Sequence, residues 1–203
     1  MSFDKDTWRT PLYFIRWLHK RFRFNVDGCA NERNALCNWW IGKELEPTGF
    51  KEAVGIIHDD FTDERLPEIL QKANNGKSLS IFVNPPYSNV TPFIQQAKRL
   101  RDAGHTVVML LNNDKSTQWY QNHIHNVANE VIDIIGGRIA FVHPITGEEI
   151  KGNSKGQMVV VFDPTMEDFV QRSVSLDFIK KVGGYFRKEQ VGRYGAKVGR
   201  YGA

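Results

Sequence analysis

The stretch Leu79-Ser80-Ile81-Phe82-Val83-Asn84-Pro85-Pro86-Tyr87 decides the fold of this chain. Its apolar β-formers predict a buried strand. The two prolines cannot continue a sheet's hydrogen-bond ladder, so the strand must end there in a rigid turn. The turn displays an amide, a fixed carbonyl and an aromatic ring at a strand's carboxyl end, where open α/β sheets bind ligands. These groups suit a planar base or an amide that carries an NH2 group. An ordinary turn after a strand is the alternative.

Strands and helices alternate along the rest of the chain. Thr10 is expected to cap the first helix, with Pro11 at its first position. Apolar spacing and turn residues predict helices from Pro11 to Phe22 and over 31–40, 66–73, 91–103, 116–128 and 165–182. They predict further strands over 24–27, 56–58, 106–111, 131–135, 138–142 and 158–162, with a polar connection over 143–157. This order predicts an α/β fold: a mostly parallel sheet with helices on both faces and an antiparallel edge.

The composition bounds the class of protein. The 203 residues, 41% of them hydrophobic, suit one globular domain, expected over 1–182. No apolar run is long enough for a membrane helix, so no membrane partner is expected. Cys29 and Cys37 match no zinc spacing, and no set of ligands gathers around the six histidines, so no metal is expected. The net charge of +4 is compatible with a polyanionic partner.

The C-terminal segment 183–203 differs from the rest. The hexapeptide Val191-Gly192-Arg193-Tyr194-Gly195-Ala196 recurs at 198–203, and the segment has no apolar periodicity. It is therefore expected to be a flexible tail. Its arginines and tyrosines could contact nucleic acid, or the duplication could have no function of its own.

Three predicted strand ends carry polar groups that could bind a ligand. Asp27-Gly28-Cys29-Ala30 places a carboxylate where it could accept hydrogen bonds from a bound cofactor, although Asp-Gly is also a common turn. Asp60-Phe61 could hold an adenine by its amino group and its face, or could be a helix cap and a core residue. The third is Asn84 to Tyr87.

Together these segments resemble the N6-adenine DNA methyltransferases of bacteriophages, the phage Dam family. The matching segments, which extend over roughly 8–163, are Trp8-Arg9-Thr10-Pro11, Phe24-Asn25-Val26-Asp27-Gly28-Cys29-Ala30, Asn34-Ala35-Leu36-Cys37, Phe82-Val83-Asn84-Pro85-Pro86-Tyr87-Ser88 and Gly137-Arg138-Ile139-Ala140-Phe141.

The resemblance implies a Rossmann-like methyltransferase fold with S-adenosylmethionine as the methyl donor. The catalytic pocket would be Asn84, Pro85, Pro86 and Tyr87. The donor would be held by Trp8, Thr10, Pro11, Asp27, Gly28, Ala30, Asp60 and Phe61, with Thr10 and Pro11 near its amino-acid end. The chain departs from the usual pattern of methyltransferases because their glycine-rich first loop is reduced here to Gly28.

The chemistry of methyl transfer fits these residues. The N6 lone pair of adenine is delocalised into the ring. Hydrogen bonds from the amino group to the Asn84 side-chain oxygen and the Pro85 carbonyl would turn that lone pair towards the methyl group. The base must be flipped out of the duplex, and Tyr87 would stack on it.

The expected enzyme is an adenine-specific DNA methyltransferase that acts as a monomer on double-stranded DNA in the cytoplasm of a bacterial host. Two alternatives stay open: a methyltransferase for an RNA base or protein glutamine, and a non-catalytic basic DNA-binding phage protein. The recognition sequence is not determined, and GATC is only what the family suggests. Target recognition is expected from the loops 112–130 and 143–157.

Overall fold

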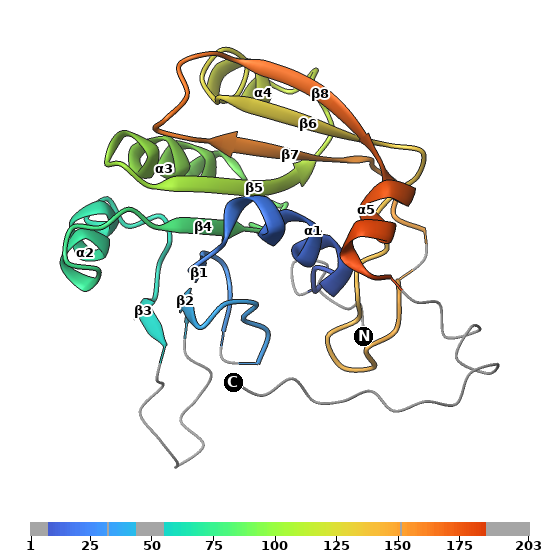
Figure 1. The fold of residues 1–203 in the computed structure, drawn as a ribbon, viewed down its shortest axis with the longest axis horizontal. Helices are drawn as coiled ribbons and strands as arrows, with labels where there is room; N and C mark the ends of the chain where they lie inside the picture. Colours follow the sequence, from blue (N-terminus) through green and yellow to red (C-terminus); the bar gives the residue numbers. More distant parts are fainter. Residues whose placement is uncertain (1–7, 32, 44–54, 151, 186–203) are drawn as a thin grey trace.

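The computed structural model describes residues 8–31, 33–43, 55–150 and 152–185 (Figure 1). Its helices are α1 (Leu12–Phe22), α2 (Leu66–Ala73), α3 (Thr91–Asp102), α4 (Gln118–His123) and α5 (Leu176–Gly183). Its strands are β1 (Val26–Asp27), β2 (Trp39–Ile41), β3 (Ile56–His58), β4 (Ser80–Val83), β5 (Thr106–Asn112), β6 (Glu130–Ile135), β7 (Gln157–Phe162) and β8 (Val170–Ser175). The repeat in the predicted tail lies outside the described residues.

One sheet runs through the molecule in the order β3-β2-β1-β4-β5-β7-β6-β8. All neighbouring strands are parallel except β7, which is antiparallel to both β5 and β6. The sequence-based prediction of a Rossmann-like, mostly parallel α/β fold with an antiparallel part is confirmed. That part lies between β5 and β6, because β8 adds a parallel strand at the rim.

Helices cover both faces of this sheet (Figure 1). Side chains alternate along a strand, so Val107, Met109 and Leu111 of β5 pack with α2, α3 and α4 on one face. Val108 and Leu110 pack with α1 and α5 on the other face. All of these β5 residues are fully buried, as expected for a strand covered on both sides.

Three predicted helices are wrong in whole or in part. The helix predicted over 31–40 is absent from its described residues: 33–38 form turns and bends that lead into β2, because side chains capture the backbone that a helix would use. The Asn34 side chain accepts from the Asn31 N–H at 2.7 Å, and Asp27 accepts from the Leu36 N–H at 3.1 Å. The helix predicted over 116–128 is only α4, and the backbone at Asn126 adopts a positive φ of 57°.

The third of these helices was predicted over 165–182. Its middle part is β8, whose residues are mostly exposed but pair with β6 in register from Val170↔Glu130 to Ser175↔Ile135. The helix begins only at Leu176, where the Ser175 hydroxyl oxygen accepts from the Phe178 N–H at 3.2 Å. Pairing with β6 outweighed local preference over this segment.

Two smaller predictions also need correction. Residues 138–142 do not form a strand: the Gln157 side chain accepts from the Ile139 N–H at 3.0 Å, and Val142 makes only isolated bridges. Thr10 does not cap α1 through its side chain, because Pro11 occupies the N-cap position and Thr10 is buried. Pro11 therefore precedes the first helical residue.

Candidate functional site

The candidate site lies at the point where the strand order reverses. From β1 the chain continues outward to β2 and β3, whereas β4 lies on the other side of β1. In open α/β sheets, ligands bind beyond the carboxyl ends of the strands at this switch point. Here the register pairs Asp27 with Phe82, so Asp27, the last residue of β1, and Asn84, the residue after β4, lie at neighbouring strand ends. Both residues line an open cleft of about 1430 Å³.

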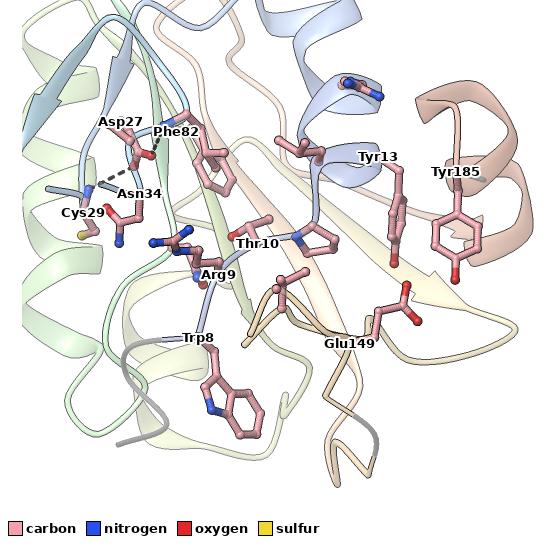
Figure 2. A pocket seen from close by; sticks show the side chains of 18 of the residues that line it. Trp8, Arg9, Thr10, Tyr13, Asp27, Cys29, Asn34, Phe82, Glu149 and Tyr185 are labelled. Atoms are coloured by element: carbon pink, nitrogen blue, oxygen red, sulfur yellow. Dashed lines mark hydrogen bonds between the residues drawn. The ribbon is translucent and has the colours of Figure 1, made fainter. Parts of the chain in front are cut away.

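The Asp27 carboxylate forms the floor of one end of this cleft (Figure 2). It is 3% exposed and accepts hydrogen bonds from the Cys29 N–H at 3.3 Å and the Leu36 N–H at 3.1 Å. Burial raises the pKa of this carboxyl to about 6, although the backbone hydrogen bonds from Leu36 and Cys29 oppose the shift. Asp27 thus holds the loop after β1 in place and keeps acceptor capacity towards the cleft.

Gly28 is required by close packing at the end of β1. A Cβ there would come within 2.9 Å of the side chains of Phe61 and Val83. The Gly28 N–H donates to the Phe82 carbonyl at 2.7 Å, and the Ala30 N–H donates to the Ile41 carbonyl at 3.0 Å. The single glycine therefore lets the loop after β1 lie directly on the sheet.

The structure does not bring Asp60 and Phe61 into the lining of the cleft. Asp60 is exposed, and its carboxylate accepts from the N–H and the hydroxyl of Thr62, both at 2.7 Å. The Phe61 ring is 3% exposed and stacks on Phe93 at 5.9 Å, although it also contacts the position of Gly28. Their contact with a donor adenine stays a prediction.

The segment before α1 crosses the cleft. Arg9 and Val142 exchange two backbone hydrogen bonds of 2.9 Å each. This bridge brings Trp8, Thr10 and Pro11 into the lining of the cleft, and their contact with a donor stays a prediction. The Trp8 ring lies 6.1 Å from that of Phe141.

In the turn after β4, the side chains of Asn84 and Tyr87 contact each other. The Tyr87 hydroxyl donates to the Asn84 side-chain oxygen at 3.1 Å, with the Leu110 carbonyl also within reach at 3.4 Å. The Tyr87 ring meets Phe141 edge-on at 6.3 Å, and Pro85 is buried. An amide oxygen has two lone pairs, so Asn84 can accept a second hydrogen bond while Tyr87 fixes its orientation.

Sequence reasoning assigned no role to several residues that line the cleft. The Arg9 guanidinium lies in its middle (Figure 2), and its buried Nε has no hydrogen-bond partner among the described residues. Arg9 and Asn34 belong to segments already singled out by resemblance, so their position in these segments was the available signal. Further lining residues without an assigned role include Tyr13, Arg33, Leu36, Glu149, Lys180 and Tyr185.

Neither a metal site nor a membrane span emerges from the part of the chain that the structure describes. No three histidine, cysteine or acidic side chains gather closely enough there to hold a metal ion. None of the described helices has the length and apolar character needed to cross a membrane.

Comparison with known proteins points to one family. A sequence model described as DNA N-6-adenine-methyltransferase (Dam) matches residues 63–185, which include Asn84 to Tyr87. The chain is 33% identical over 164 residues to the DNA N-6-adenine-methyltransferase of Haemophilus phage HP1 (strain HP1c1), covering 79% of this chain and 80% of that protein. It is 27% identical over 184 residues to the DNA N-6-adenine-methyltransferase of Escherichia phage T1, covering 83% and 67% respectively.

Proposed function

Because this chain belongs to the Dam family of DNA N-6-adenine-methyltransferases, we propose that it transfers a methyl group from S-adenosylmethionine to N6 of an adenine flipped out of duplex DNA. The observation that carries the proposal is the position of Asn84 beside Asp27 at the switch point of the sheet. An amino-group acceptor and a cofactor-binding carboxylate thus line the same cleft.

The cleft fits the proposed donor. S-adenosylmethionine carries an ammonium and a carboxylate, and the cleft offers Asp27 for the first and the unpartnered Nε of Arg9 for the second. The segment Trp8 to Pro11 would close over the donor's amino-acid end. Gly28 and Ala30 would shape the floor below the donor. When bound, S-adenosylmethionine supplies an electrophilic methyl group.

The Asn84-to-Tyr87 turn makes N6 of the target adenine more reactive by fixing the orientation of its amino group. The Asn84 side-chain oxygen and the Pro85 carbonyl accept from the two N–H bonds of N6, which directs the nitrogen lone pair towards the donor side of the cleft. Pro86 keeps the turn rigid. Tyr87 stacks on the flipped base, and its hydroxyl keeps the Asn84 amide in the accepting orientation.

Four basic side chains make the cleft attractive to a polyanion. Arg9, Arg16, Arg33 and Lys180 all line it, and the whole chain carries a net charge of +4. Such charges attract DNA phosphates whatever the sequence. We expect double-stranded DNA as the substrate and a monomeric enzyme in the cytoplasm of the bacterial host.

Asn84→Ala tests the proposal. The full-length chain is incubated with labelled donor and plasmid DNA, and N6-methyladenine is measured by nucleoside mass spectrometry. Loss of the oriented acceptor should lower the rate on the order of a hundredfold or more, while calorimetry shows donor affinity unchanged. Near-normal turnover of the variant would remove Asn84 from the mechanism. If RNA or protein glutamine is methylated and DNA is not, the chain is a methyltransferase for an RNA base or for protein glutamine. If the parent does not bind the donor, a non-catalytic DNA-binding protein is favoured.

Tyr87→Phe and Tyr87→Ala separate the two roles of Tyr87. The phenylalanine variant keeps the ring, so it should bind DNA normally and turn over more slowly at saturation. The alanine variant should also lose a stacking contact of about 1–3 kcal/mol and capture the base poorly at limiting DNA. Equal kinetics of the two variants would mean that the ring has no role of its own.

A further inference from the structure

The end of the cleft opposite Asp27 holds a second group of polar side chains that the proposed reaction does not use. Figure 2 shows Tyr13 and Tyr185 side by side, with their hydroxyls directed towards Glu149. The two rings meet edge-on at 5.0 Å. These residues come from the start of α1, the connection between β6 and β7, and the residue after the C-cap of α5. Three segments far apart in the sequence thus meet here.

The Tyr13 hydroxyl is the unusual group of this cluster. Tyr13 is 5% exposed, yet its hydroxyl has no hydrogen-bond partner among the described residues. Burial, with smaller contributions from Glu149 and Tyr185, raises the pKa of Tyr13, so it remains a neutral phenol. A buried hydroxyl without a partner is unfavourable, and a ligand that pairs with it removes this penalty.

The cluster offers a defined hydrogen-bonding pattern. The exposed Glu149 carboxylate only accepts, whereas a phenol both donates and accepts. The edges of nucleobases carry N–H donors beside acceptors, and Glu accepts from N4 of cytosine. Lys180 also lines this cleft, and its Nζ lies 4.9 Å from the centre of the Tyr185 ring.

We propose that Tyr13, Glu149 and Tyr185 form a recognition site for a DNA base near the target adenine, selecting a base edge that carries an exocyclic amino group; this inference rests on the proposed function. Glu149 accepts from the amino group. Tyr13 and Tyr185 supply the neighbouring hydroxyls.

The position of Glu149 favours DNA over the donor's ammonium as the source of this amino group. Val142 bridges to Glu149 on one side and to Arg9 on the other. The adjacent Phe141 packs against Tyr87, which is proposed to stack on the flipped adenine. The segment that carries Glu149 thus contacts the DNA side of the site through Phe141 and the donor side through Arg9. Asp27, the carboxylate proposed for the donor's ammonium, lies at the far end of the cleft (Figure 2), which leaves Glu149 for an amino group of DNA.

The test uses the full-length chain and a set of duplexes that share one target adenine, with every base placed in turn at each flanking position. At one of these positions the parent protein should prefer the three bases that carry an exocyclic amino group over thymine, which has none. Glu149→Gln should lower that preference on the order of tenfold to a hundredfold, because the introduced amide also pairs with carbonyl edges. Donor affinity should change less than twofold. Glu167→Gln, which removes another exposed carboxylate, is the matched control.

Tyr13→Phe provides a second variant that distinguishes recognition from structural support. Removing an unpartnered hydroxyl should leave the melting temperature unchanged or raise it, while the same base preference weakens. An unchanged preference profile in both variants would overturn the inference, as would a tenfold loss of donor affinity with the profile retained. Competition binding of the duplexes without donor reports the preference independently of turnover. A parent protein that forms no N6-methyladenine therefore refutes the proposed function, whereas a flat binding profile refutes only the recognition site.

Discussion

At the scale of single residues, Asp27 shows how the local fold sets the chemistry of a side chain. The carboxyl is 3% exposed and contacts backbone N–H groups rather than a cation. Burial therefore dominates and raises its pKa to about 6. The folded state then binds a proton more tightly than the unfolded state, between the ordinary carboxyl pKa of 3.8 and about 6. This group therefore makes the free energy of unfolding fall as pH rises through that interval.

Asp27→Asn should reveal this cost. The quantity to compare is the free energy of unfolding of the variant minus that of the parent. This difference should rise by at most about 3 kcal/mol from pH 3.5 to pH 7, because only the parent has to bury a charge at the higher pH. Urea unfolding at a series of pH values measures the difference. Asp168→Asn, which removes an exposed carboxyl, is the matched control. A flat difference for Asp27→Asn would show that the carboxyl does not titrate abnormally.

At the scale of elements, the contact between α1 and α5 depends on Gly183. A Cβ at this position would overlap the backbone carbonyl of Tyr13. Gly184 then ends the helix with a left-handed conformation at φ 70°. Gly183 and Gly184, which fall in the segment predicted to be a flexible tail, therefore serve as a close-packing residue and a helix cap. This contact also brings Tyr185 against Tyr13.

Gly183→Ala should separate α5 from α1. Overpacking against a backbone that cannot rotate away should lower the free energy of unfolding by about 3 kcal/mol. Thermal or urea unfolding measures the change. Lys181→Ala, on the exposed side of the same helix, keeps the packing and should have little effect. Equal stability of Gly183→Ala and the parent would show that α5 can shift without loss.

At the scale of the whole molecule, an ion-paired carboxylate connects α1 to the rim of the sheet. Glu130 of β6 is buried, and it pairs with Arg21 of α1 at 2.6 Å and with Arg172 of β8 at 2.6 Å. Burial alone would raise the pKa of Glu130, but the hydrogen bonds from the two arginines outweigh it and lower the pKa. The N-terminal helix and the C-terminal strand are thus attached to the same residue.

Two truncations should locate the end of the folded domain. A chain that ends after Val182 loses Gly183, the cap at Gly184 and the Tyr185 ring, so its melting temperature should fall.

A chain that ends after Tyr185 should melt like the parent. It lacks Arg187, Lys188, Arg193, Lys197 and Arg200, so DNA affinity and its salt dependence should both decrease if these residues contact phosphates. Unchanged DNA affinity and salt dependence would favour a duplicated hexapeptide without a function of its own. A lower melting temperature of the chain that ends after Tyr185 would place part of 186–203 in the fold.

The reliability of prediction from the sequence differed between elements for physical reasons. β4, β5 and β7 could be predicted because an apolar run buried on both faces has few alternatives. β8 could not be predicted, since its mostly exposed residues are ordered by pairing with β6. The turns over 33–38 were missed because the Asp27 carboxylate stabilises them from outside the segment.

The candidate site likewise has a part that the sequence could predict and a part that depends on tertiary contacts. The residue types of the Asn84-to-Tyr87 turn predicted a pocket for a planar base or amide at a strand end. The resemblance carried by this turn and by the loop after β1 then implied an amino-group methyltransferase. Both segments could be recognised in the sequence because short-range strand and turn chemistry determines them. Only the tertiary structure decided that Arg9 lies in the cleft, that Phe61 is covered by Phe93, and that Tyr13, Glu149 and Tyr185 meet. These contacts join residues far apart in the chain, and they depend on the packing of α1, α5 and the β6–β7 connection rather than on any local pattern.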